Sequence, residues 1–325
     1  MKRVVVFLLL SINFASASAM EKITSDTVRE WLSRVSRAGE TLNYEGTFVY
    51  RHGDQMEAVH VIHKSDSKGE RERMVSLNGV AREVIRNNDK VICILPDNRS
   101  VVVDNHGPET KLPSIPSDLS QIGEYYDFVF EGYERVASRQ ARRVMIRPRD
   151  NFRYGYRLWI DDAFELLLRS ELLDTKGNAI EQIMFTDLRL YESLDEQRLK
   201  PNISGTEYTW VTDKDDKRNA PMPMDDGWQA RKLPKGFMMS HRNMHHLPDN
   251  RMPVEHLVYT DGLAWVSIYI EKLDTEKDIL QGSSTMGAVN AYGRIMGDYH
   301  VTAVGEVPPS TVKLISDSVN HQQKP

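Results

Sequence analysis

Arginine is concentrated between residues 135 and 157, where eight arginines and no lysine occur. The planar guanidinium group binds phosphate and carboxylate through paired hydrogen bonds, so these arginines are candidates for an anion-binding site. Charged and apolar residues alternate in the same stretch, which is also typical of a strand with one solvated face. Arg142 is the exception, because it falls on the apolar face and needs an anionic partner or the rim of a cavity. Two interpretations therefore stay open, ordinary strand surface or a lipid- and anion-binding set made of Arg142, Arg143, Arg147 and Arg157.

Histidine forms a second cluster in the C-terminal third of the chain. Its members are His241, His245, His246 and His256. The spacing of His241 and His245 would let both bind zinc from one helix face. However, Pro248 and Pro253 disfavour a long helix there, and no carboxylate or cysteine completes a ligand set. We therefore predict no metal site and interpret the cluster as a polar loop, or as surface histidines that sense pH.

The motifs of common enzyme classes are absent from the sequence. It has no Gly-x-Ser-x-Gly elbow, no phosphate-binding loop and no dinucleotide-binding fingerprint. The stretch from Asp213 to Asp216 resembles the start of a calcium loop but lacks the glycine and the distal glutamate. The formal net charge of -5 argues against nucleic-acid binding, which usually goes with a basic balance. We therefore predict a binding protein without a cofactor, and not an enzyme.

The N-terminus has the three parts of a secretory signal peptide. Lys2 and Arg3 supply positive charge, residues 4–10 are apolar, and Ala17-Ser18-Ala19 fits the cleavage site. The apolar run is too short for a membrane anchor, which needs about 20 apolar residues. We therefore predict cleavage before Met20. Because a single cysteine allows no internal disulfide, we predict the bacterial periplasm as the location of the mature protein.

Hydrophobic spacing predicts one helix followed by a long run of strands. Val28, Trp31, Leu32 and Val35 share one face of a predicted helix that ends near Gly39. Alternating segments separated by turn residues then predict a large, curved antiparallel sheet. Its strands are expected at residues 44–50, 59–63, 74–77, 80–85, 91–95, 100–103, 128–136, 142–147, 154–160, 165–173 and 179–190. The only cysteine, Cys93, is expected in a buried strand.

Composition places a domain boundary after this run of strands. Asp, Lys, Asn and Pro are frequent between residues 192 and 226, as in a linker. The chain is predicted to consist of a signal peptide (1–19), a first domain (20–191), the linker (192–226) and a second domain (227–325). In the second domain, strands are expected at 228–233, 256–260, 264–270, 287–292 and 299–304, and a final helix begins at Pro308 and Pro309. The predicted fold is α+β: a curved antiparallel half-barrel with a covering helix, then a smaller α+β domain.

One face of the curved sheet is expected to be too wide for a single helix to cover. The residues predicted to line an apolar cavity there are Tyr44, Phe48, Tyr50, Ile115, Tyr156 and Leu158. Ile115 belongs to a segment with two prolines, which is predicted to be a loop or lid. A large uncovered apolar surface usually marks a binding site. The alternative is a closed barrel that is filled by its own side chains.

Six segments, spread over nearly the whole predicted mature chain, occur in the order known from one family. They are NYEGTFVY (43–50), YGYRLWID (154–161), EQIMFT (181–186), LPKGF (233–237), DGLAWVS (261–267) and GEVP (305–308). In these segments the sequence resembles the MucB/RseB family of periplasmic regulators of sigma-E (AlgU-type) factors.

The resemblance implies a LolA-like half-barrel that binds lipid or peptide, joined to a smaller domain. It implies that the protein binds the periplasmic domain of a single-pass, RseA/MucA-like anti-sigma factor and shields it from regulated proteolysis. Lipopolysaccharide or another acylated ligand would then release the partner in an envelope stress response. The alternatives are an acyl-lipid or lipoprotein carrier of the LolA type and an envelope hydrolase whose catalytic residues are not evident. The oligomeric state, including a homo-oligomer, is left open.

Overall fold

The computed structural model describes residues 25–104, 122–201, 208–212, 227–245, 253–273 and 279–321. The predicted signal peptide, the loop with Ile115 and the stretch from Asp213 to Asp216 lie outside these ranges. Within them, no helix is both long enough and apolar enough to cross a membrane.

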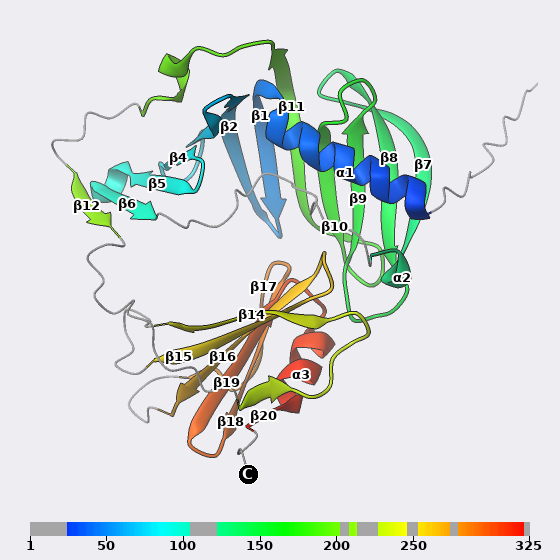
Figure 1. Cartoon of the computed structure of the whole chain (residues 1–325), viewed down its shortest axis with the longest axis vertical. Helices are drawn as coiled ribbons and strands as arrows, with labels where there is room; N and C mark the ends of the chain where they lie inside the picture. Colours follow the sequence, from blue (N-terminus) through cyan, green and yellow to red (C-terminus); the bar gives the residue numbers. More distant parts are fainter. Residues whose placement is uncertain are drawn as a thin grey trace, which may run out of the picture.

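Helix α1 (Ser25–Thr41) lies across the first sheet, as Figure 1 shows. Trp31, Leu32 and Val35 of this helix are buried, which confirms the predicted apolar face for these three residues. They share one core with residues of the sheet that include Val144 and Leu158. The helix therefore covers this part of the sheet as predicted.

Twelve strands of the described chain form the first sheet. They are β1 (Asn43–His52), β2 (Gln55–Asp66), β3 (Gly69–Ser76), β4 (Glu83–Asn87), β5 (Lys90–Leu95), β6 (Ser100–Asp104), β7 (Tyr126–Val136), β8 (Arg139–Pro148), β9 (Gly155–Asp161), β10 (Leu167–Leu173), β11 (Ala179–Tyr191) and β12 (Thr209–Thr212). Two short helical segments, η1 (Pro96–Asn98) and α2 (Ile122–Tyr125), accompany them. Cys93 lies in β5 as expected but is only half-buried, and burial raises the pKa of its thiol.

The first sheet is open, with the strand order β12-β6-β5-β4-β3-β2-β1-β11-β10-β9-β8-β7. Neighbouring strands are antiparallel except for β12 and β6, which are parallel. The first and last strands of this order do not pair with each other, so the alternative of a closed barrel is wrong and the predicted half-barrel is confirmed. Strand β1 sits inside the sheet, because it pairs with β2 on one side and with β11 on the other.

Part of the predicted linker belongs to the first domain. The 3-10 helix η2 (Glu196–Leu199) begins after Asp195, whose carboxylate accepts a hydrogen bond from the backbone N–H of Gln197. Leu194 and Leu199 pack against Ile62 of β2. Strand β12 then adds to the edge of the sheet next to β6. Residues on both sides of the undescribed stretch 202–207 thus contact the first sheet, through two apolar anchors and a strand that polar composition does not reveal.

The second domain has a six-stranded sheet, a two-stranded sheet and one helix among its described residues. The six strands, in the order β14-β15-β16-β19-β18-β17, are β14 (Met238–His245), β15 (Val254–Thr260), β16 (Trp265–Lys272), β17 (Gly282–Met286), β18 (Val289–Met296) and β19 (Tyr299–Gly305). Strand β13 (Trp228–Ala230) pairs with β20 (Val319–His321). Helix α3 (Pro309–Ser318) begins at the predicted prolines and buries Val312 and Ile315 in the core of this domain.

Candidate functional site

The predicted apolar residues that the structure describes lie on the face of the first sheet that carries α1. In the ladder, Tyr50 is opposite Ile183, Ile183 opposite Ser170, and Ser170 opposite Leu158, so these side chains share one face. Leu158 packs in the same core as Trp31 of α1. Tyr44, Phe48 and Leu158 are buried, while Tyr50 and Tyr156 are half-buried. An acyl chain could therefore reach most of this set only if a covering segment moved.

Arg142 lies on this same face and has the anionic partner that its position required. It is opposite Ile160 in the ladder, and its Nε donates a hydrogen bond of 2.6 Å to Asp162. Its guanidinium also lies 5.9 Å from the centroid of the Trp31 ring. Arg142 therefore joins the end of β8 to both the β9–β10 turn and helix α1.

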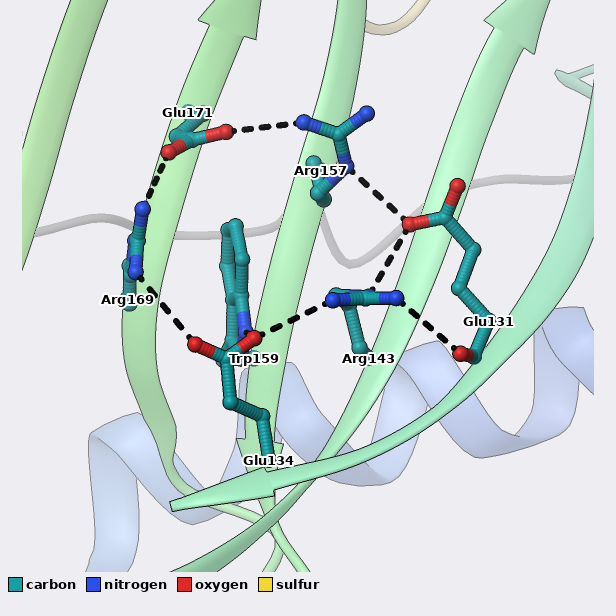
Figure 2. Close-up of a pocket in the computed structure, with 7 residues that line it drawn as sticks. All are labelled: Glu131, Glu134, Arg143, Arg157, Trp159, Arg169 and Glu171. Atoms are coloured by element: carbon teal, nitrogen blue, oxygen red, sulfur yellow. Dashed lines mark hydrogen bonds and ion pairs between the residues drawn. The ribbon is translucent and has the colours of Figure 1, made fainter. Parts of the chain in front are cut away.

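Arg143 and Arg157 lie on the opposite face of the sheet, in a closed ring of charges. Figure 2 shows the ring in front of the strands, with the helix behind them. Its members, in order around the ring, are Glu171, Arg157, Glu131, Arg143, Glu134 and Arg169. The six successive N–O contacts are 3.1, 3.0, 3.2, 3.2, 3.8 and 2.5 Å, and the last returns to Glu171. Strands β7, β8, β9 and β10 all contribute to the ring.

The buried side chain of Trp159 forms the floor of the ring. Its indole N–H donates a hydrogen bond of 2.8 Å to Glu134, and the guanidinium of Arg169 lies 4.0 Å from its ring centroid. The hydrogen bond from Trp159, together with Arg143 and Arg169, holds the pKa of the Glu134 carboxyl below its ordinary value. Glu134 is therefore ionised at neutral pH, and it balances the cations on either side.

The ring encloses a pocket of about 320 Å³ but offers no free cation. Its three guanidinium groups alternate with three carboxylates, so each arginine already faces two anions. A phosphate would have to displace a carboxylate before it could bind. Arg147 lies outside the ring and is exposed. The structure thus brings together only Arg143 and Arg157 of the four candidates, on the face opposite the predicted apolar cavity.

A second polar cluster, which the sequence did not predict, lies where the two domains meet. Arg153 has no exposed side-chain surface and contacts Asp261 of the second domain at 2.5 Å. Asp261 also accepts a hydrogen bond of 2.9 Å from the hydroxyl of Tyr126. A further bond joins Arg153 to the carbonyl of Lys235, at 2.6 Å. Burial and the nearby Asp261 raise the pKa of Tyr126 well above its ordinary value, so its hydroxyl remains a donor at neutral pH.

Further direct contacts hold this joint together. The amide of Asn290 donates a hydrogen bond of 3.0 Å to the hydroxyl of Tyr154, and Thr311 donates one of 2.8 Å to the carbonyl of Phe152. Gly236 has a φ of 86°, and a Cβ there would lie 2.2 Å from an atom of the Tyr125 ring. Only glycine combines that backbone angle with such a close approach. The segments LPKGF, DGLAWVS and YGYRLWID, which carry the family resemblance, each place a residue at this joint.

The histidine cluster does not form a metal site among the described residues, where no group of three or more histidine, cysteine, aspartate or glutamate side chains could hold a metal ion. His241 and His245 lie in strand β14 instead of the predicted loop or a helix. Four residues along a strand span about 13 Å, so these two cannot share one zinc ion. His256 is in the next strand, where it hydrogen-bonds to Ser267 at 2.9 Å and stacks on Tyr269. His246 lies outside the described residues.

Comparison with known proteins gives matches over both domains. The family model of the MucB/RseB N-terminal domain matches residues 27–203, and that of the MucB/RseB C-terminal domain matches residues 222–320. The sigma factor AlgU regulatory protein MucB of Pseudomonas aeruginosa is 31% identical over 299 residues, which cover 89% of this chain and 90% of that protein. The sigma-E factor regulatory protein RseB of Escherichia coli K12 is 25% identical over 301 residues, with 89% of each chain covered.

Solved structures agree with the sequence matches. The structure is similar to one from the Pseudomonas aeruginosa MucA/MucB complex, with a TM-score of 0.73 and 29% identity over 92% of this chain and 100% of that chain. It is also similar to a crystal structure of MucB in complex with MucA(peri), with a TM-score of 0.70 and 29% identity over 91% of this chain and 99% of that chain. The protein therefore belongs to the MucB/RseB family.

Proposed function

We propose that this protein is a periplasmic regulator of a sigma-E or AlgU-type factor and acts by binding the periplasmic domain of a membrane-bound anti-sigma factor. The similarity in both domains to MucB, solved in complex with MucA, carries the proposal. The names of the relatives describe regulatory proteins and not enzymes. Bound to this protein, the anti-sigma factor is shielded from the protease that begins its destruction.

Binding is tested with the mature protein and the purified periplasmic domain of the MucA-like anti-sigma factor from the same organism. We expect a stable complex in size-exclusion chromatography, and slower cleavage of the anti-sigma domain by its envelope protease when this protein is added. A control reaction uses an unrelated protease substrate, whose cleavage should not change. No complex at micromolar concentrations would refute the proposal, and lipid binding without any peptide partner would favour the alternative of an acyl-lipid carrier.

We further propose that lipopolysaccharide or another acylated, phosphorylated lipid releases the partner. The support is the apolar face of the first sheet, which carries Tyr44, Phe48, Tyr50, Tyr156 and Leu158, with Arg142 on the same side. If the lipid binds the free protein more tightly than the protein bound to its partner, then the lipid weakens partner binding by the free energy that the partner takes from lipid binding. This coupling free energy is about 1–3 kcal/mol in typical cases. Arg142 is the candidate for the lipid phosphate, because Arg143 and Arg157 lie on the far face within the charge ring.

The two neighbouring arginines provide a matched pair for testing release. The preformed complex is titrated with lipopolysaccharide, and Arg142→Ala is compared with Arg143→Ala. We expect Arg142→Ala to raise the lipid concentration needed for release by tenfold or more, since a charge-assisted hydrogen bond contributes about 1.5–3 kcal/mol. Arg143→Ala should leave the release curve unchanged. Equal curves for wild type and Arg142→Ala would remove this arginine from the lipid site, while a shift for Arg143→Ala alone would move the site to the face of the ring.

A further inference from the structure

We propose that His63 is an imidazolium ion in the folded protein and latches the C-terminal end of helix α1 to the first sheet, so that this latch loosens when His63 loses a proton. The latch concerns the junction between α1 and β1. It goes beyond the proposed function and acts whatever ligand or partner the protein binds.

The ring of His63 is buried between two hydrogen-bond acceptors. Only 1% of the residue is exposed. Its Nδ1 lies 2.7 Å from the carbonyl oxygen of Leu42, and its Nε2 lies 3.0 Å from a carboxylate oxygen of Glu70. A carbonyl and an ionised carboxylate can only accept hydrogen bonds, while a neutral imidazole has a single N–H. Both contacts are therefore hydrogen bonds only if both ring nitrogens carry a proton.

The charges around His63 favour the same protonation state. In the ladder His63 is opposite Tyr44 of β1 on one side and Glu72 of β3 on the other. Glu72 is in turn opposite Arg86 of β4, and Glu70 lies on the same face of β3. These two carboxylates outnumber the guanidinium, so an imidazolium makes the group neutral. The hydrogen bond from His63 is also the main cause that holds the pKa of the Glu70 carboxyl below its ordinary value, so Glu70 carries the negative charge.

The carbonyl that His63 contacts belongs to the end of α1. Leu42 alone connects α1 to β1, and its N–H donates to the carbonyl of Ala38 in the last turn of the helix. Carbonyls at a helix C-terminus carry a partial negative charge that a nearby cation stabilises. The last turn of α1 has no basic residue, and the charged side chains of Arg37 and Glu40 are exposed. His63 therefore supplies the missing cation from strand β2.

The direction of the response follows from these contacts. The ring of Tyr44 stacks on His63 with centroids 4.7 Å apart, and it stays neutral because burial raises the pKa of its hydroxyl well above the ordinary value. A neutral His63 that still donates to Leu42 turns the lone pair of Nε2 toward the carboxylate of Glu70. The latch is therefore complete at low pH and weakens as the pH rises through the range in which His63 loses its proton.

Nitrogen NMR of the full mature protein, labelled with ¹⁵N in its histidines, tests the number of protons directly. Both ring nitrogens of an imidazolium are protonated, which separates its signals from those of the two neutral tautomers. The signals of His63 are assigned by their loss in His63→Phe. We expect His63 to be an imidazolium at pH 7.0, where an ordinary exposed histidine is mainly neutral. A neutral His63 at pH 7.0 would overturn the proposal.

Hydrogen exchange in peptides that cover residues 36–44 tests the latch itself. Wild type and Glu70→Gln are compared at the same pH, so the intrinsic chemical exchange rate cancels. The new amide can donate to Nε2, so a neutral His63 keeps its bond to Leu42 in this variant. We expect equal exchange at pH 5.0 and about tenfold faster exchange of wild type at pH 8.0, as for a lost hydrogen bond to a charged group.

Two further variants separate the latch from a general effect of histidine. His63→Phe keeps a ring against Tyr44 but lacks both hydrogen bonds, so it should exchange about tenfold faster than wild type at pH 5.0, and it serves if Glu70→Gln does not fold. The matched control is His60→Gln, which removes the other histidine–carboxylate pair of β2, with Glu45, and should keep the wild-type response. Equal exchange of wild type and Glu70→Gln at both pH values contradicts the latch. So does exchange of His63→Phe at the wild-type rate at pH 5.0, or a response that disappears in His60→Gln.

Discussion

Arg153 carries a charge that it cannot lose, in a place where water does not reach it. Its side chain has no exposed surface, and a guanidinium group stays protonated throughout the accessible pH range. Such a charge is tolerated only where carboxylates and carbonyls satisfy it. Asp150, Asp261 and the carbonyl of Lys235 do so here, and three aromatic rings lie around the group.

Removing one charge of the buried Arg153–Asp261 pair should lower the free energy of unfolding far more than removing one charge of an exposed pair. We expect Asp261→Asn to lower the free energy of unfolding by about 3–5 kcal/mol, because it leaves Arg153 without its main counter-charge. The matched control is Arg149→Ala, which breaks an exposed pair with Asp127 and should cost less than about 1 kcal/mol. Urea unfolding followed by circular dichroism measures both. Similar losses of unfolding free energy in the two variants would contradict the conclusion that the buried Arg153–Asp261 pair stabilises the joint between the domains.

The sequence predicted the kind of environment for some single residues but not their partners. The alternation around Arg142 showed that this arginine lies on the apolar face, and Asp162 is the anion that it required. Nothing comparable marked Arg153, because its partner Asp261 is 108 residues away and in another domain. The carboxylates that neutralise Arg143 and Arg157 likewise come from neighbouring strands, so local spacing could not distinguish a free anion site from a balanced ring.

At the scale of elements, the charge ring joins four strands across one face of the half-barrel. Each guanidinium in it bridges two carboxylates, so removing one side chain affects several contacts at once. We expect Arg157→Met to lower the free energy of unfolding by about 1–2 kcal/mol, more than a single surface pair contributes. Arg135→Met changes an exposed arginine on β7 and should stay within about 0.5 kcal/mol of wild type. Thermal unfolding at low and high salt should show a smaller difference at high salt, since screening weakens the ring.

The link between η2 and the β2–β3 hairpin should weaken in strong acid. Lys68 and Arg71 lower the pKa of Glu196 from its ordinary value to about 2. A lowered pKa means that the contact stabilises η2 above the ordinary glutamate value and is lost as the pH falls through about 2. We expect Glu196→Gln to speed hydrogen exchange in residues 195–200 at pH 6, where wild type is protected. Glu192→Gln, an exposed neighbour, should not change it.

Elements with strong alternation were predictable, while three edge strands, β12, β14 and β17, were not. The predicted strands of the first domain correspond to β1–β11, and most of these strands bury apolar residues in a core. Strand β17 is Gly-Ser-Ser-Thr-Met with mostly exposed side chains, so it has no buried face to leave a pattern. Strand β14 begins with two methionines that are both exposed, and a bulge interrupts its pairing with β15. Backbone pairing alone places both strands, and sequence periodicity does not report it.

For the whole molecule, the joint predicts that cleavage between the domains will not separate them. Exposed, proline-rich polar segments are preferred sites of proteolysis, so limited digestion should cut near residues 221–226 and give fragments of about 200 and 100 residues. We expect both fragments to elute together in native size-exclusion chromatography. After the same digestion of Asp261→Asn they should elute apart. Separation of the wild-type fragments would show that the contacts at the joint are too weak to hold the domains.

The position of β1 within the first sheet has a consequence for how the chain acquires its structure. Asn43 pairs with Tyr191, so the central ladder of the half-barrel closes only after almost the entire first domain has been delivered. Pairings between such distant residues make folding slow, because a long loop must be ordered before its contacts form. Until then, β1 keeps one edge unpaired and able to join a foreign strand. Chaperones that cover this edge during folding should therefore govern the yield of the protein more than its final stability does.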